Sequence, residues 1–418
     1  MTRYMWRGAS ASAIALMFAG TAGTAIAQDL TMWARDSGAA LTERVVDRWN
    51  EEHPDQQVEL TIIPSNEMVT KFVTAATSGS VPDLLSLDLI FAPPFMRAGF
   101  FEDVTDQVTA NPAWENTVQA HRDLATYDDR FYGVPFTPEN SILIYNKDLF
   151  EQAGLDPEDP PSTTDEILEA ARAIDALGDD VYGFYFSGAC GGCNIFTMAP
   201  QMWAVDGTEV LPSQCDAPAL EGESIRTILQ NYRTMWEEGL IPESAQVDGG
   251  AQFVSAFTAG NVGMMGSGNF AVGTYAEIAP DIDFGVAPLP GPEEGQISSF
   301  AGGDILMIPS KAEHKEAARE FLDWVISDDV QQGVYAESGN MPGRVDIAAE
   351  AFDGQEKLMT TLTALESAKT PYSTHFFALS NDPAGPWLQV IQTAVFDGDI
   401  DGAIETGRDR MNAIVCDE

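Results

Sequence analysis

The chain has 418 residues, with 21 Lys and Arg against 65 Asp and Glu and a formal net charge of −44. This acidity excludes a nucleic-acid-binding protein and a basic patch for anionic lipid, because both need a positively charged face. The content of 44% hydrophobic residues, with eight Trp, ten Tyr and 22 Phe, excludes a disordered chain. At roughly 150 residues per domain, the length predicts two or three packed units.

The first 27 residues have the pattern of an export signal. Arg3 and Arg7 precede an apolar run of small residues over 13–22, and Ala25-Ile26-Ala27 matches an A-x-A cleavage site. The run is too short to cross a bilayer, and no later segment reaches about 18 uninterrupted apolar residues. We therefore expect cleavage before Gln28 and a soluble, periplasmic product.

Strands and helices alternate at the start of the remaining chain. Segments 29–34, 57–63 and 83–87 are rich in strand-forming residues. Two helices are predicted between them from apolar residues at helical spacing, namely Leu41, Val45, Val46 and Trp49, then Val69, Phe72, Val73 and Ala76. This alternation predicts an α/β fold with a largely parallel sheet.

The later elements follow from the same patterns. Residues 132–146 are predicted to be extended, and the turn-rich stretch 156–163 leads to a helix N-cap at Ser162 or Thr163. The last hundred residues are predicted to be mostly helical. Further helices are predicted at about 164–177, 194–205, 219–238, 250–259 and 317–325, and further strands at 182–186, 261–265, 284–288 and 304–308.

Four cysteines in an exported chain indicate two disulfides, for which three pairings are possible. Cys190-Gly-Gly-Cys193 could be a redox motif or half of a zinc site. However, no second Cys pair or His follows at the spacing of a zinc site. We favour a structural disulfide that fixes a glycine loop.

Signatures of catalysis are missing from the sequence. With four His in the chain, there is no H-E-x-x-H, G-x-S-x-G or G-x-x-x-x-G-K-[ST] motif. Residues 266–271 match G-x-G-x-x-A, but the late position and the negative charge favour a strand-to-helix turn over a dinucleotide site. We expect no metal and no cofactor. Paired carboxylates are abundant, so a secreted glycoside hydrolase stays open as an alternative.

Residues 141–154 (SILIYNKDLFEQAG) resemble the Y-N-K-D-L-[FL]-x-x-A-G signature of family 1 extracellular solute-binding proteins. These are the maltose-binding-protein-like receptors of ABC importers. The resemblance extends over essentially the whole chain after residue 27, because further motifs follow in the family's order. These are Pro82-Asp83-Leu84, Gly133-Val134-Pro135, 257–264 with Gly263 in place of the usual Ala, Gly302-Gly303, 316–322 and 341–344.

The resemblance implies a two-lobed periplasmic-binding-protein fold of type II, α/β in class, with hinge crossovers and a ligand cleft between the lobes. The N-terminal lobe would comprise residues 28–138 and 286–350, and the C-terminal lobe residues 140–284 and 352–418. A helix that resembles one of the family begins at Asn194, so we expect Cys190 to pair with Cys193. Cys215 then pairs with Cys416, and both lie in the second lobe.

The resemblance also places ligand-binding residues in the first lobe and its crossover. Glu139, six residues before Tyr145, matches a carboxylate that binds sugar in the maltose-binding relative; an exposed loop acid is the alternative. Arg35, Asp36 and Ser37 end the first strand, where the family has polar ligands. Asp88 follows a strand too, with a helix cap as its alternative role.

In the second lobe, Asn194 stands where the maltose binder has a stacking aromatic residue, which argues against maltose itself. Phe270 falls where the family often has Trp, with core packing as the alternative, and Trp387 lies within a residue of the family's stacking Trp. The remaining expected ligand residues are Gly303, Asp304 and Arg344.

The function implied is that of a receptor without catalytic residues, which captures a mono- or oligosaccharide and delivers it to an ABC-transporter permease. The expected partners are the carbohydrate and the transmembrane permease subunits, with no nucleic acid, and we expect a monomer. A receptor of the same fold for a non-sugar solute, such as a polyamine or a phosphate ester, is a further alternative.

Overall fold

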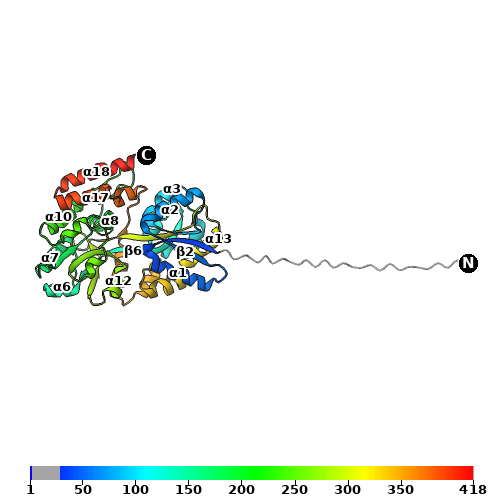
Figure 1. The fold of residues 1–418 in the computed structure, drawn as a ribbon, viewed down its shortest axis with the longest axis horizontal. Helices are drawn as coiled ribbons and strands as arrows, with labels where there is room; N and C mark the ends of the chain where they lie inside the picture. The colour runs from blue at the N-terminus through cyan, green and yellow to red at the C-terminus, as the bar shows by residue number, and fades with distance from the viewer. Residues whose placement is uncertain (2–28, 418) are drawn as a thin grey trace.

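The structure is a computed structural model that describes residue 1 and residues 29–417. The expected export signal and the cleavage site before Gln28 fall outside the described residues. None of the helices in the described part combines the length and the apolarity that crossing a bilayer requires. Two lobes lie side by side and share a central pair of long strands (Figure 1).

The first lobe begins with the alternation that the sequence predicts. Strands β1 (Leu30–Arg35), β2 (Val58–Ile63) and β3 (Leu84–Asp88) are parallel, with Leu30 opposite Val58 and Met32 opposite Leu84. The first helix between them buries its predicted apolar face, whereas the second buries Phe72 and Ala76 together with Met68 and Ala75 and leaves the predicted Val73 exposed. The other elements of this part are α1 (Ala39–Glu52), α2 (Ser65–Ser78), α3 (Ala92–Arg97), α4 (Thr105–Ala110), α5 (Gln119–Leu124), β4 (Thr126–Tyr127), β5 (Arg130–Phe131) and α13 (Lys315–Val325).

Two long strands cross from one lobe to the other. β6 (Gly133–Asn146) and β11 (Ile297–Met307) are antiparallel, and Glu139 lies opposite Gly302 in their register. They stand at the centre of a sheet with the order β2-β1-β3-β11-β6-β8-β7. The prediction of a largely parallel sheet is therefore wrong. β11 runs antiparallel to both β3 and β6, and β6 runs antiparallel to β8 and β9, so the sheet is mixed.

The second lobe packs helices around the other end of this sheet. Helix α7 begins with a capping box at Thr163, one of the two predicted caps. The elements are α6 (Lys147–Gln152), α7 (Thr164–Asp175), β7 (Tyr182–Tyr185), α8 (Gly191–Thr197), α9 (Ala199–Trp203), α10 (Glu223–Glu237), α11 (Ser255–Thr258), β8 (Val262–Gly268), α12 (Ala271–Ile278), β9 (Phe284–Ala287), β10 (Leu289–Pro290), α16 (Glu356–Glu366), β12 (Ala368–Lys369), α17 (Pro386–Ile391) and α18 (Ile400–Cys416). The helices α14 (Asp328–Val330) and α15 (Val345–Ala351) pack against residues of the first lobe, since Val330 shares a core with Leu30 and Ala348 shares one with Val118.

Two predicted helices differ from the observed ones. The helix predicted over 194–205 is split at Met198 into α8 and α9, because Pro200 cannot donate the backbone hydrogen bond that a continuous helix needs. The helix predicted over 250–259 is only α11, preceded by turns around Gly249 and Gly250. The strand predicted at 304–308 begins earlier, at Ile297.

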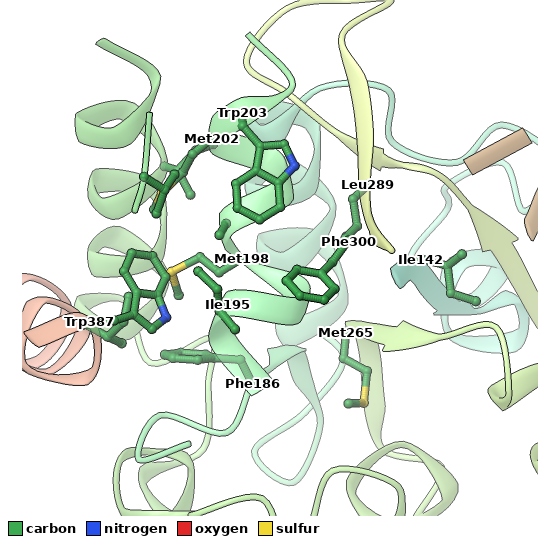
Figure 2. Packing of buried hydrophobic residues seen from close by; sticks show 14 of the residues in the cluster. Ile142, Phe186, Ile195, Met198, Met202, Trp203, Met265, Leu289, Phe300 and Trp387 are labelled. Carbon is green, nitrogen blue, oxygen red and sulfur yellow. The ribbon is translucent and has the colours of Figure 1, made fainter. Parts of the chain in front are cut away.

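The hydrophobic core of the second lobe contains two tryptophans. Trp203 is 4% exposed, as expected for a core residue, and packs near Phe300 with ring centroids 6.2 Å apart. Trp387 is fully buried, and Figure 2 shows its indole beside Met198. This packing fixes α8, α9 and α17 against one another.

Both expected disulfides are confirmed. Cys190 and Cys193 close a short loop at the start of α8, and Cys215 joins Cys416 at the end of α18 across 201 residues of sequence. The second bond ties the end of the described chain to the body of the second lobe.

Candidate functional site

Polar residues gather where the strands of the first lobe end next to the second lobe. β1 ends at Arg35 and β3 ends at Asp88, both at carboxyl ends of parallel strands. Asp304 on β11 lies directly opposite Asp88 in the register. The fold therefore brings together three of the predicted site residues that are far apart in the sequence.

The Arg35 guanidinium binds both of these carboxylates. Its Nε donates to Asp304 Oδ1 at 2.8 Å, a second nitrogen contacts the same oxygen, and Nη1 lies 2.9 Å from Asp88 Oδ2. Asp304 is 2% exposed and also accepts a hydrogen bond from Ser86 Oγ at 2.5 Å. Burial opposes the charge of Arg35, but Asp304 and Asp88 raise its pKa above the ordinary value.

Glu139 faces this cluster from the crossover in β6. It is partly exposed, and its carboxylate makes no hydrogen bond to any residue within the described part of the chain. Burial raises the pKa of Glu139 to about 7; Asp304 and Asp88 add to the effect and Arg35 opposes it. Burial also raises the pKa of Asp88, with Arg35 opposing. The carboxylates of Asp88, Asp304 and Glu139 thus lie near a single guanidinium, that of Arg35. Carboxylate oxygens of this cluster can therefore accept hydrogen bonds from a ligand.

A cavity of about 310 Å³ opens beside Glu139, between the two lobes. On the side of the first lobe, Ser37 and Gly38 at the start of α1 line it. On the side of the second lobe, Asn269 and Phe270 line it, between β8 and α12. The cavity therefore has walls from both lobes and Glu139 in its lining, an arrangement typical of a cleft that closes on a small polar ligand.

The crossover has a backbone that only glycine accommodates well. Gly303 has φ +95°, and a Cβ at this position would lie 1.8 Å from the Thr137 carbonyl oxygen. The Asp304 backbone N–H donates to Thr137 Oγ1 at 3.2 Å. Gly303 thus acts through the backbone, since it allows β6 and β11 to approach closely beside the charged cluster.

Of the predicted site residues, Ser37, Glu139 and Phe270 line the cavity, whereas Arg35, Asp88, Gly303 and Asp304 lie outside its lining, as do the residues described next. Asp36 is exposed and accepts hydrogen bonds from the Ser65 backbone N–H at 2.9 Å and from the Ser65 hydroxyl, which lowers the pKa of Asp36. Arg344 is 5% exposed and binds Asp328 at 2.9 Å and Asp346 at 2.6 Å. Arg344 therefore ties α14 to the start of α15.

Two residues expected to contact ligand in the second lobe are fully buried. Asn194 donates from its side-chain amide to the Ser187 carbonyl at 3.1 Å, which anchors the first turn of α8. Trp387 packs within the core shown in Figure 2. Asn194 Oδ1 and Trp387 Nε1 have no hydrogen-bond partner among the described residues, but both side chains are enclosed in the core and do not line the cavity.

The structure also adds residues to the candidate site. Asn269 accepts from the Asn140 backbone N–H and donates to the Pro138 carbonyl, both at 3.3 Å, so it holds β8 against the crossover. Asn269 lies within the G-x-G-x-x-A match at 266–271. The sequence predicts a strand-to-helix turn there, and this interpretation does not distinguish Asn269 from its neighbours. His121 of α5 is fully buried, and burial lowers its pKa to about 4 although nearby Asp304 opposes the shift.

Comparisons with known proteins agree with this architecture. An ABC transporter solute-binding protein of Thermotoga lettingae, solved with α-D-tagatose bound, superimposes with a TM-score of 0.80 at 24% identity, and covers 93% of this chain and 100% of its own. The arabinooligosaccharide-binding protein of Halalkalibacterium halodurans is 24% identical over 73% of this chain and 69% of its own. The diacetylchitobiose-binding protein of Streptomyces coelicolor is 22% identical over 89% of this chain and 86% of its own.

A family model gives the assignment directly, because it matches residues 34–332, which cover more than half of the chain and include both crossing strands. The chain therefore belongs to the bacterial extracellular solute-binding proteins.

Proposed function

We propose that this protein is the saccharide receptor of an ABC importer. The observation that carries the proposal is the Glu139 carboxylate, which lacks a hydrogen-bond partner among residues 29–417, lies near Arg35 and lines a cavity between the two lobes. Vicinal hydroxyl groups donate hydrogen bonds, and carboxylates accept them well. The relatives whose names specify an arabinooligosaccharide, a diacetylchitobiose and a bound tagatose support the same ligand class.

Closure of the lobes would couple capture to delivery. Ser37 and Gly38 on one side and Phe270 on the other can contact one ligand together only when the lobes are close. A ligand that touches both lobes therefore favours the closed state by its differential affinity. The closed surface would be the one that a membrane permease recognises, and the protein would act as an exported monomer without chemistry of its own.

The lobe boundaries belong to this proposal. Residues 28–138 would start the first lobe and 140–284 the second, with the crossover at Glu139. β9 pairs with residues 143–146 of β6, which lie beyond that crossover. We therefore place the return crossover at Gly302, later in the chain than residue 286, and assign residues 352–418 to the second lobe.

The test is a thermal-shift screen with neutral saccharides, including D-tagatose, diacetylchitobiose, maltose and an arabino-oligosaccharide, followed by calorimetry. We expect affinities around micromolar, about −8 kcal/mol, because a receptor must release its cargo. The Glu139→Gln variant should bind roughly tenfold more weakly or worse, since hydrogen bonds to a charged acceptor contribute about 1.5–3 kcal/mol. Absence of any stabilisation across the panel would contradict the proposal.

Two alternatives make different predictions in the same samples. A glycoside hydrolase would return the saccharide cleaved, whereas a receptor returns it unchanged, as chromatography after incubation will show. A receptor for a polyamine or a phosphate ester would respond to those compounds and not to neutral sugars.

A further inference from the structure

Two side chains of opposite charge line the cavity from opposite lobes. Arg44 belongs to α1 of the first lobe and Glu277 to α12 of the second, and both line the cavity that Glu139 also lines. Both residues are exposed. Neither side chain makes an ion pair or a hydrogen bond with any residue in the part of the chain that the structure describes. Their charges are therefore not compensated in this arrangement of the lobes.

Each of the two charges is fixed to its own lobe. The helix of Arg44 is anchored in the core of the first lobe, where Trp49 is 1% exposed. The helix of Glu277 is anchored in the second lobe, where Tyr275 is 1% exposed and belongs to a different core. Glu139 lies between them on the crossover strand β6. A rotation of the lobes about the crossover therefore changes the distance from Arg44 to Glu277.

Arg44 and Glu277 account for two of the three charged side chains in the cavity lining, and Glu139 is the third. A cleft that closes on its ligand narrows, so its two walls approach each other. Arg and Glu have long, flexible side chains that can meet across a narrowed gap. Exposed ion pairs change an equilibrium constant by a factor of about 1.5–5, and this factor decreases as salt screens the charges.

We infer that Arg44 and Glu277 form an ion pair across the cleft when the lobes close, and that this pair makes the affinity for a neutral ligand depend on ionic strength. The inference goes beyond the proposed function, on which it rests only for the identity of the ligand. An interaction that exists only in the closed state shifts the population toward that state, and a ligand that needs the closed state then binds more tightly.

The first experiment reverses the two charges singly and together in the full chain. The variants are Arg44→Glu, Glu277→Arg and the double variant with both changes. Arg48→Glu is the matched control, because Arg48 lies one turn further along α1, pairs with Glu52 of the same helix and does not line the cavity. Calorimetry measures the dissociation constant of a neutral panel saccharide that binds the wild type, at low ionic strength and in about 0.5 M sodium chloride.

At low ionic strength, we expect the dissociation constant to rise about three- to fivefold in each single variant, because a repulsion replaces the attraction. The double variant and the control should stay within about twofold of the wild type, since the double variant restores the pair with its polarity reversed. In high salt all five proteins should converge. If Arg44 contacts the saccharide itself or pairs with Glu139, Glu277→Arg will not rescue Arg44→Glu, and the inference is then wrong.

A crosslink tests the approach of the two positions without relying on a saccharide. In a variant with both Arg44→Cys and Glu277→Cys, closure should bring the two Cα atoms within the about 7 Å that a disulfide requires. After mild oxidation, peptide mapping should find the 44–277 link, and much less of a 48–277 link when Arg48→Cys replaces Arg44→Cys. Absence of the 44–277 link refutes the inference whether or not a saccharide binds. If the link forms but no saccharide binds the wild type, the proposed function fails while the approach of the two positions is supported.

Discussion

Glu139→Gln should make the stability of the protein respond differently to pH. In the folded chain, burial raises the pKa of Glu139 from its ordinary value of 4.5 to about 7. Below about pH 4.5 the carboxyl group is protonated in both the folded and the unfolded states, so its ionisation does not change the free energy of unfolding. As pH rises from 4.5 to about 7, the unfolded state loses this proton while the folded state keeps it. The free energy of unfolding of the wild type therefore falls over this interval.

The size of the effect follows from the interval. At 1.36 kcal/mol per pH unit, an interval from 4.5 to about 7 corresponds to about 3 kcal/mol. Above about pH 7 both states are ionised and the cost stays constant. Gln cannot ionise, so the free energy of unfolding of the variant does not fall in this way. Near neutral pH the variant should therefore be more stable than the wild type by up to about 3 kcal/mol.

Urea denaturation of the two proteins at several pH values between 4 and 8 measures the difference directly. Many of the 65 acids titrate in this range, so the quantity to follow is the stability of the variant minus that of the wild type. Glu405→Gln on the exposed face of α18 is the control, and its difference from wild type should stay flat. A difference for Glu139→Gln that does not change with pH would refute the argument that desolvation and the nearby carboxylates of Asp304 and Asp88 raise the pKa of Glu139.

Three further substitutions test the framework around the site by urea denaturation. Arg35→Met should lower the free energy of unfolding by about 3–5 kcal/mol, because the buried Asp304 and the 20% exposed Asp88 lose their only cation among the described residues; an unchanged midpoint would contradict this. Gly303→Ala should cost at least about 3 kcal/mol, whereas Gly354→Ala, where nothing lies within 4 Å of the new Cβ, should cost about 1 kcal/mol. Cys416→Ser should lower the free energy of unfolding by about 5 kcal/mol and Cys193→Ser by about 2 kcal/mol. The reason is that the Cys215–Cys416 bond closes a far longer loop than Cys190–Cys193 and so restricts the unfolded chain more. The reverse order would contradict this explanation by the entropy of the unfolded chain.

Local patterns in the sequence predicted the first lobe well. The apolar spacing around Val45 defines a helix whose buried face is the predicted one, and in α2 the predicted Phe72 and Ala76 are buried but Val73 is exposed. In the second lobe, Thr163 caps α7 because its side chain and Glu166 satisfy each other's backbone groups. Strand direction was not predictable in this way. Whether β11 runs parallel or antiparallel to β3 depends on how the chain returns from the second lobe, and no short segment encodes that.

Only the part of the candidate site that follows from local patterns in the sequence could be predicted. Arg35 and Asp88 follow strands, and the carboxyl ends of parallel strands meet at one edge, so their proximity could be expected. The orientation of Trp387 depends on which face of α17 packs against α8, and the residues near Trp387 in sequence are apolar on several sides. Its burial therefore had no local signal.

The central position of β11 has a consequence for the order in which the molecule can form during synthesis. β3 and β6 are not neighbours in the sheet, since β11 lies between them. A growing chain that has not yet reached Ile297 therefore has the outer strands of the first lobe and no strand to join them to β6. Such a chain would expose unpaired strand edges, and the contacts that complete it are far apart in sequence, which slows folding. We expect fragments that end before Ile297 to remain unfolded or to aggregate, so that neither lobe is an independent folding unit.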